Sequence, residues 1–271
     1  MAAPLVTLTT DFGVRDPYAA AMKGVIYAIH PHLTVTDLSH EIPPHDIMEG
    51  AFFLAGALPF FPDRTIHVAV VDPGVGTSRH GVVIQAGGQY LVCPDNGIAN
   101  FFLRRHPVQD ARIIENPRFM RREISPTFHG RDIFAPVAAH LARGVPLCEF
   151  GSRITRLAEL PVPVPRITPG RIEGEVVHID RFGNLITNIT QGDLPKESSC
   201  VVLLGAVRLG NLHHTYADVP PGEPLALIGS AGFLEIAIHG GSARAAFQFD
   251  RGQAITIETT SFLNREEGVD V

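Results

Sequence analysis

Residues 65–79, TIHVAVVDPGVGTSR, determine the class of fold. The first seven form a nearly continuous apolar run, which is typical of a strand buried on both faces of a parallel sheet. The glycine and proline residues that follow predict a loop at the carboxyl end of that strand. A strand buried on both faces needs cover on both sides, so we expect an α/β domain with a mainly parallel sheet.

The residues on either side of this stretch repeat a strand-helix pattern. Before it, Leu5–Thr9 and Leu33–Leu38 are predicted strands, and Pro17–Ile29 and Asp46–Leu58 are predicted helices. After it, the predicted elements are a hairpin of Gly81–Ala86 and Gln89–Val92 joined by Gly87-Gly88, and a last helix, Arg131–Arg143, ending before Gly144. This alternation predicts that residues 1–160 form one α/β domain.

The chain changes character after a proline-rich segment. Residues 161–169, PVPVPRITP, hold four prolines and should form an extended, stiff linker. Residues 170–271 then contain short apolar runs separated by Gly, Pro and Asn turns, which predict a smaller β-barrel or sandwich domain. The predicted strands are Arg171–Ile179, Leu185–Ile189, Val201–Leu204, Leu225–Ile228, Leu234–Ile238 and Ala254–Glu258.

Composition excludes several classes of protein. Hydrophobic residues make up 45% of the chain and charged residues 18%, as in an ordinary globular protein. The net charge of -6 leaves no basic stripe for a nucleic acid. The longest apolar run, residues 51–61, falls short of the roughly 20 residues that cross a membrane, and residues 1–4 do not begin a signal peptide. We expect a cytoplasmic protein that binds neither nucleic acid nor membrane.

The three cysteines are an odd number at wide spacing, which argues against a disulfide framework and against a zinc site. They are Cys93, Cys148 and Cys200, and we expect buried free thiols. No histidine pair is accompanied by a matching carboxylate or cysteine set, so the sequence predicts no metal.

Asp72 and Arg79 stand at the two ends of a loop that leaves one strand and enters the next, so their side chains can meet. A carboxylate held by a guanidinium has a fixed direction, and the two together can orient one water molecule. The alternative is a salt bridge that only braces the loop, and general experience favours it when nothing else is considered. His129 lies ahead of a predicted helix, and imidazole suits proton transfer near neutral pH.

Other polar residues lie in turns where a ligand can reach them. Asp11 and Asp16 bracket the first strand-to-helix turn, where carboxylates can accept from vicinal hydroxyls or bind an ammonium group. Capping of the helix by Asp16 is the structural alternative. Asp180 and Asn184 flank Phe182-Gly183, a turn that can present an aromatic face and an amide to a flat heterocycle. An ordinary hairpin turn is the alternative there.

Six motifs, taken in order, resemble the S-adenosyl-L-methionine (SAM) hydrolase (adenosine-forming) family, also called SAM hydroxide adenosyltransferases, which is related to fluorinase and chlorinase. The resemblance spans nearly the whole chain, and the order and spacing of the motifs together are specific. The motifs are TTDFG at 9–13, VDPGVG at 71–76, PDNG at 94–97, FHGRD at 128–132, DRFGN at 180–184 and GS at 229–230.

This resemblance implies a site and a reaction. It implies hydrolysis of SAM to adenosine and L-methionine by a water that Asp72, Arg79 and His129 activate for attack at the ribose C5′, without a cofactor. It further implies that residues 1–160 form the SAM-binding and catalytic domain, and that residues 170–271 complete the adenine and methionine site. Asp11 would then hold the ribose diol, Phe182 and Asn184 the adenine, and Asp16, Asp180 and Ser230 the methionine end.

The resemblance also implies a homotrimer, with each site between the α/β domain of one subunit and the β domain of its neighbour. The related halogenases carry Tyr at the position of Asp72, a residue other than His129, and an inserted loop where this chain has Gly87-Gly88, which favours hydroxide over halide. Ala231 stands where the halogenases have an arginine for the methionine carboxylate. A SAM-dependent halogenase, a SAM or adenosine sensor without catalysis, and an unrelated α/β protein stay open as alternatives.

Overall fold

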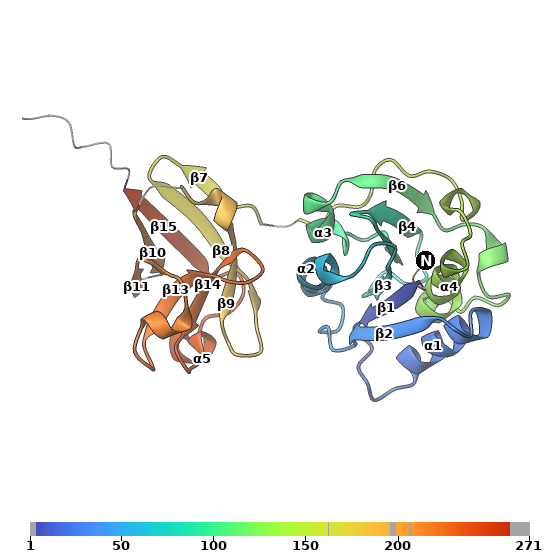
Figure 1. Cartoon of the computed structure of the whole chain (residues 1–271), viewed down its shortest axis with the longest axis horizontal. Helices are drawn as coiled ribbons and strands as arrows, with labels where there is room; N and C mark the ends of the chain where they lie inside the picture. The colour runs from blue at the N-terminus through green and yellow to red at the C-terminus, as the bar shows by residue number, and fades with distance from the viewer. Residues whose placement is uncertain (1–3, 162, 196–198, 206, 261–271) are drawn as a thin grey trace, which may run out of the picture. The chain divides into compact units, whose positions relative to one another are not determined.

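The computed structural model describes residues 4–161, 163–195, 199–205 and 207–260, and it divides the chain into two compact units, Met1–Pro161 and Val162–Val271 (Figure 1). No helix in the described part of the chain is both long and apolar enough to span a membrane. The N-terminal unit is α/β, and the regular structure of the C-terminal unit is mainly β-strand. The predicted fold class is therefore confirmed.

The N-terminal unit is built on one six-stranded sheet in the order β2-β1-β3-β5-β4-β6. Strands β2, β1, β3 and β5 pair in parallel, and the β4–β5 hairpin and β6 add the antiparallel edge. The elements are β1 (Leu5–Thr10), α1 (Tyr18–Ile29), β2 (Thr34–Ser39), α2 (Ile47–Ala57), β3 (Ile66–Val70), β4 (Gly81–Ala86), β5 (Gln89–Pro94), α3 (Asn100–Arg105), β6 (Val108–Ile113) and α4 (Ala135–Ala142).

Strand β3 lies in the middle of the sheet, and every one of its residues is buried. Its side chains alternate between two cores because successive strand residues point to opposite faces. Val68 and Val70 pack in a core with α1 and α4, whereas Ala69 and Val71 pack in a second core with α2 and α3. The double burial expected from the apolar run is therefore observed.

Several elements differ from those expected. The predicted helix Arg131–Arg143 is a π-helical segment, Gly130–Phe134, followed by α4, which ends at Ala142, two residues before Gly144 with its φ of +90°. Helix α3 and strand β6 were not predicted, because α3 spans fewer than two turns and the sequence of β6, VQDARI, does not alternate between apolar and polar residues. Short 3-10 helices cover Leu58–Phe60, Pro117–Phe119 and Leu147–Glu149.

The C-terminal unit is one nine-stranded sheet in the order β11-β10-β15-β8-β9-β14-β13-β12, with β7 paired to β8. Strands β11 and β10 at one end approach β13 and β12 at the other, which gives a nearly closed barrel. The elements are β7 (Arg166–Thr168), β8 (Arg171–Ile179), β9 (Leu185–Thr190), β10 (Ser199–Leu204), β11 (Val207–Gly210), β12 (Leu212–His213), β13 (Pro224–Ile228), β14 (Phe233–Ile238), α5 (Ala243–Phe247) and β15 (Ala254–Thr260), with 3-10 turns at Gln191–Asp193 and Tyr216–Asp218.

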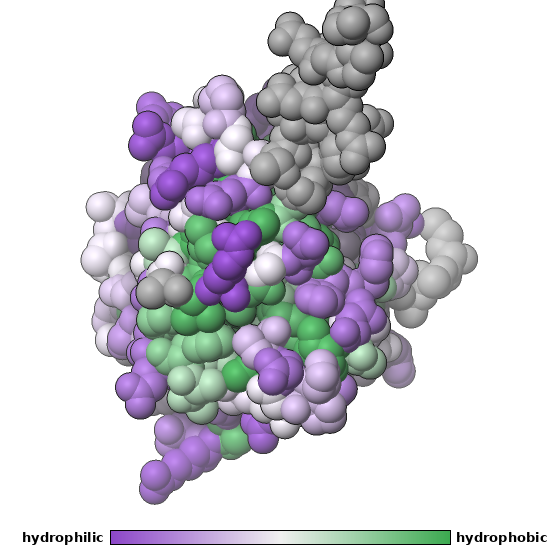
Figure 2. Space-filling view, turned by 90° about the vertical axis from the view of Figure 1, so that its left-hand side faces the viewer, coloured by the Kyte–Doolittle hydropathy of each residue, from purple (hydrophilic) through white to green (hydrophobic). Residues whose placement is uncertain are grey.

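Strand β7 lies inside the segment that the prolines marked as a linker, and β11, β12 and α5 are further elements that the sequence did not predict. Figure 2 shows apolar residues gathered on one face of the C-terminal unit among polar ones. Contiguous apolar surface of this kind often marks a protein contact.

The three cysteines are free thiols, as predicted, but only two of them are buried. Cys93 lies in β5 and Cys200 in β10, whereas Cys148 is exposed in a 3-10 turn. The expectation of burial is therefore wrong for Cys148, because that turn lies on the surface.

Burial of His67 in the centre of β3 predicts a pH-dependent stability. Burial lowers the pKa of His67 to about 4, although the neighbouring Gln89 amide offsets part of this effect, and Thr7 Oγ1 lies 2.7 Å from the ring Nδ1. Between pH 6.5 and about 4 the unfolded chain therefore binds a proton that the folded chain does not. Stability should fall as pH drops through this window, by about 3 kcal/mol from this residue.

Urea denaturation of wild type and His67→Gln at several pH values checks this prediction. The variant should lose less stability than wild type between neutral and acid pH. His32→Gln, on the exposed surface, is the matched control and should follow the wild-type curve. Parallel curves for wild type and His67→Gln would contradict the assignment.

Candidate active site

The loop between β3 and β4 brings its two charged ends together. A turn folds it back, with Val75 N–H donating to the Asp72 carbonyl at 3.1 Å and Thr77 N–H donating to the Gly74 carbonyl at 3.2 Å. Gly76 has a φ of +78°, and a Cβ there would lie 2.4 Å from the Pro126 carbonyl oxygen. Only glycine therefore lets this loop pack against the segment that leads to His129.

Asp72 and Arg79 form a bidentate ion pair. Arg79 Nε donates to Asp72 Oδ1 at 2.9 Å, and Arg79 Nη2 donates to Asp72 Oδ2. The side chains are only 5% and 11% exposed, respectively. Removing such a pair from water carries a desolvation cost, so this contact differs from the exposed salt bridges that contribute little. The predicted meeting of the two side chains is thus observed.

His129 completes a contact with the same guanidinium, because Arg79 Nη2 lies 2.8 Å from His129 Nδ1. A guanidinium can only donate, so Nδ1 must be the unprotonated acceptor and the ring proton must lie on Nε2. Burial, together with the positive charge of Arg79, lowers the pKa of His129 below its ordinary value of 6.5. The imidazole is therefore neutral at neutral pH, with an N–H to offer.

A buried carboxylate holds the segment that carries His129. Asp132 accepts two hydrogen bonds from Arg131, both at 2.7 Å, and one from Ser125 N–H at 2.9 Å. Burial alone would raise the pKa of Asp132, but these hydrogen bonds keep it below the usual value, so Asp132 is ionised. The Arg131 guanidinium also lies over the Phe128 ring, 4.9 Å from its centroid. The turn that carries His129 is therefore held in place by the contacts of Asp132 and Arg131.

The turn after β1 carries Asp11. Its Oδ2 accepts from His45 N–H at 2.9 Å, and Thr10 Oγ1 accepts from Phe12 N–H at 3.2 Å. Asp16 is exposed, and the first residue of the helix cap is Pro17, without a side-chain capping bond. Capping by Asp16, the structural alternative for this residue, is therefore not observed.

A cavity of about 270 Å³ joins these pieces within the N-terminal unit. Its wall includes Asp11, Asp72 and His129, whereas Asp16 lies outside it. Three aromatic rings, those of Phe12, Tyr18 and Phe128, also line it and contact one another at centroid distances of 5.2 to 5.8 Å. None of these rings was predicted as a site residue, although Phe12 belongs to the motif TTDFG and Phe128 to the motif FHGRD. The lining residues are Asp11, Phe12, Tyr18, Pro44, His45, Val70, Asp72, Val75, Thr127, Phe128, His129 and Gly130.

In the C-terminal unit, Asp180 organises the turn between β8 and β9. Its Oδ1 accepts from Phe182 N–H and Asn184 N–H, both at 2.9 Å, and its Oδ2 accepts from Asn184 Nδ2 at 2.9 Å. Asn184 is buried, but the Phe182 side chain is 76% exposed. The turn thus presents the predicted aromatic ring at the surface, whereas the Asn184 amide donates to Asp180 within the turn.

Ser230 lies in a different turn, between β13 and β14, and is exposed. It lines a separate cavity of about 1010 Å³ together with His213 and His214. Asp180, Phe182 and Asn184 do not line this cavity. Asp180, Phe182 and Asn184 thus share one turn, and Ser230 belongs to another.

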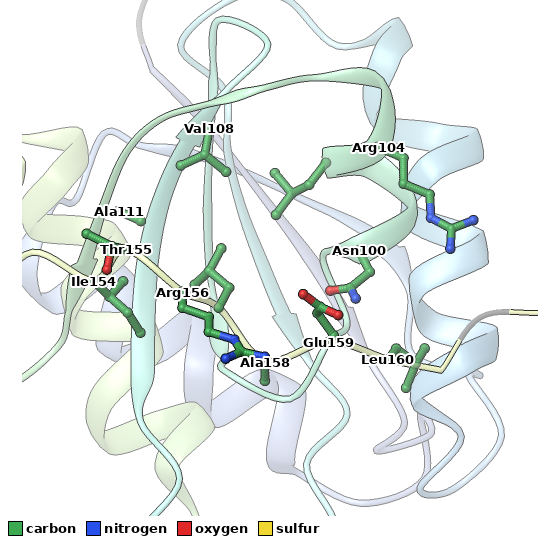
Figure 3. Close-up of a pocket in the computed structure, with 12 residues that line it drawn as sticks. Asn100, Arg104, Val108, Ala111, Ile154, Thr155, Arg156, Ala158, Glu159 and Leu160 are labelled. Carbon is green, nitrogen blue, oxygen red and sulfur yellow. The ribbon is translucent and has the colours of Figure 1, made fainter.

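Figure 3 shows another cavity of the N-terminal unit, of about 470 Å³, where the segment Ile154–Leu160 passes α3 and β6. None of the predicted site residues lines it. Among the described residues, no group of three or more His, Cys, Asp or Glu side chains is arranged to hold a metal ion.

Comparison with known proteins matches both units. Residues 6–151 match the SAM hydroxide adenosyltransferase N-terminal domain, and residues 174–256 match the C-terminal domain of the same name. An (R)-S-adenosyl-L-methionine hydrolase of Thermus thermophilus is 40% identical over 93% of this chain and 98% of its own length. A fluorinase of Actinoplanes sp. is 28% identical over 94% of this chain and 97% of its own length.

The fold also matches a solved structure. The crystal structure of an uncharacterised conserved protein from Thermotoga maritima superimposes with a TM-score of 0.86 at 36% identity, covering 93% of this chain and 99% of that one. The family expected from the six motifs is thereby confirmed: the chain belongs to the SAM hydroxide adenosyltransferase family.

Proposed function

We propose that this chain hydrolyses S-adenosyl-L-methionine to adenosine and L-methionine in the cavity lined by Asp11, Asp72 and His129. The observation that carries the proposal is the Asp72–Arg79–His129 contact, which places a carboxylate and a neutral imidazole in the wall of one cavity. The similarity to an (R)-S-adenosyl-L-methionine hydrolase over nearly the whole length of both chains supports the same activity.

The substrate brings an activated leaving group to the reaction. A water oxygen attacks the ribose C5′, the C5′–S bond breaks, and its electron pair passes to sulfur, which leaves as the neutral thioether of methionine. Positive charge on sulfur is lost as the transition state forms, so a dry and largely apolar cavity favours the step. The rings of Phe12, Tyr18 and Phe128 supply such surroundings.

Asp72, Arg79 and His129 have different roles in activating the water. Asp72 accepts the proton that the attacking water loses, as a general base. Arg79 donates to both carboxylate oxygens and to His129 Nδ1, and so fixes the partners relative to each other. His129 directs its Nε2–H toward the water and orients it. Alignment of this kind removes much of the entropic barrier to attack.

The substrate-binding roles follow from the resemblance. Asp11 holds the ribose diol from the wall of the cavity, and Asp16 contributes to the methionine end. In residues 170–271, Phe182 and Asn184 seat the adenine, and Asp180 and Ser230 contact the methionine end. The cavity of about 270 Å³ is near the lower limit for ligand pockets, roughly 300 Å³, so further surface must complete the site.

The assembly and location stay predictions. We expect a homotrimer in the cytoplasm that binds no nucleic acid, and sedimentation equilibrium of the purified protein would measure its mass. A monomer that turns over SAM at full rate would contradict the trimer.

The direct test of the function is incubation of the purified protein with SAM and chromatography of the products. Adenosine and L-methionine should appear in equal amounts, with and without a chelator, because the proposed step uses no metal. Added chloride or fluoride should give no 5′-halo-adenosine. A halogenated product would favour the halogenase, and tight binding without products would favour a sensor.

Asp72→Asn should separate binding from chemistry. Asparagine keeps the size of the side chain and one acceptor oxygen but cannot take the proton of the water. Turnover should fall by about 10²- to 10⁴-fold, mainly in kcat, while SAM affinity stays within about threefold. Single-turnover rates and a binding titration measure the two effects. Wild-type turnover by this variant would reduce Asp72 to a loop brace.

Asp11→Ala and Asp16→Ala form a matched pair for the two ends of the substrate. Asp11→Ala should weaken both SAM and adenosine, because the ribose is common to both; each charged hydrogen bond lost is worth about 1.5 to 3 kcal/mol. Asp16→Ala should weaken SAM but leave adenosine unchanged. Calorimetric titration of both ligands checks this, and an unchanged adenosine affinity in Asp11→Ala would refute the ribose assignment.

A further inference from the structure

The motif Pro94-Asp95-Asn96-Gly97 contributes no residue to the wall of the proposed reaction cavity. It begins with the last residue of β5, the strand next to β3 in the sheet, and so it lies beside the carboxyl end of β3, from which the chain continues to Asp72. Asp95 and Asn96 are partly buried, and neither lines the cavity that holds Asp72 and His129. Any effect of this turn on the reaction must therefore act through residues that do line the cavity.

The side chain of Asn96 bonds to the peptide that precedes Asp72. Its Nδ2 donates to the Val71 carbonyl at 2.9 Å, and its Oδ1 accepts from Ile98 N–H at 3.2 Å. The second bond fixes the direction of the amide, so the first bond holds the Val71 carbonyl in a set orientation. The Val71 carbonyl and the Asp72 nitrogen belong to the same planar peptide group. The orientation of this carbonyl therefore sets the position of the Asp72 Cα, from which the side chain extends.

The same turn also bonds to the chain just after the other end of the loop 72–79. Asp95 N–H donates to the His80 carbonyl at 2.9 Å, directly after Arg79. The Asp95 side chain points to a different partner and accepts from Ala158 N–H at 2.8 Å, in the segment that Figure 3 shows passing beside Asn100. The loop 72–79 is thus anchored at residue 71 by a side chain and at residue 80 by a backbone group.

We propose that Asn96 is a positioning residue for the hydrolysis, which sets the Asp72–Arg79 pair against the attacking water by holding the Val71 carbonyl. This inference rests on the proposed function of Asp72. Displacement of a reacting group by about 1 Å can cost roughly 100-fold in rate, so a lost anchor next to the base should appear in kcat. Substrate affinity should change little, since Asn96 lies outside the cavity.

Asn96→Asp is the sharpest variant because it changes one group and nearly no volume. The introduced carboxylate can still accept from Ile98 N–H, but it cannot donate to the Val71 carbonyl and instead opposes it with an acceptor. We expect kcat to fall roughly 10- to 100-fold, with SAM and adenosine affinities within about threefold of wild type. Kinetics and calorimetric titration give these two quantities.

A pH profile distinguishes a lost hydrogen bond from a general loosening of the fold. Once protonated, the introduced carboxyl can again donate to the Val71 carbonyl. The rate of Asn96→Asp relative to wild type should therefore rise between about pH 8 and about pH 5. A purely structural defect would leave that ratio constant or lower it.

Asn116→Asp is the matched control. Asn116 makes the same pair of bonds to partners outside the loop, with Nδ2 donating to the Glu149 carbonyl at 2.7 Å and Oδ1 accepting from Arg118 N–H at 3.1 Å. The identical change there should leave kcat within about twofold of wild type. A fall in kcat equal to that of Asn96→Asp would overturn the inference.

The double variant Asp72→Asn with Asn96→Asp separates this inference from the proposed function. If Asn96 acts through Asp72, the second change should slow the Asp72→Asn enzyme by less than about twofold. Full additivity, or a wild-type kcat in Asn96→Asp alone, would overturn the positioning role while leaving the function intact. A wild-type rate in Asp72→Asn alone would instead refute the proposed base.

Discussion

The bidentate contact between Asp72 and Arg79 is the interaction on which the rest of the site depends. Both side chains are nearly buried, and an unpaired charge in either position would be strongly destabilising. Arg79 Nη2 contacts Asp72 and also His129, so one guanidinium fixes the directions of both partners. Arg79 therefore sets the direction of both the Asp72 carboxylate and the His129 ring.

The sheet brings this contact about. Strand β3 is covered on both faces, so its end is rigid, and Asp72 leaves it directly after Val71. Strand β4 runs antiparallel to β5, so Arg79, just before β4, lies at the same edge of the sheet as Asp72. The turn after β5 bonds to the Val71 and His80 carbonyls, at the two ends of the loop 72–79. Ligands of open α/β sheets lie at the carboxyl ends of the strands, and this cavity follows that rule.

Much of this could be predicted from the sequence because the signals are local. The apolar run 65–71 indicates a doubly covered strand, and the spacing of Asp72 and Arg79 allows their contact. The aromatic wall could not be predicted, because Tyr18 meets Phe128 only through packing of segments far apart in the chain. The role of Asn96 was hidden for the same reason, since its partner Val71 lies 25 residues away.

The charges of Asp72, Arg79 and His129 explain why the rate of the proposed reaction depends on their alignment. Asp72 and Arg79 cancel, and His129 is neutral, so a cationic sulfonium meets no net repulsion from these three groups. Any carboxylate is a weak base compared with hydroxide and must be well placed to be effective, so in the proposed reaction alignment contributes more than proton affinity. Residues outside the cavity that fix the position of Asp72, as proposed for Asn96, then contribute to the rate.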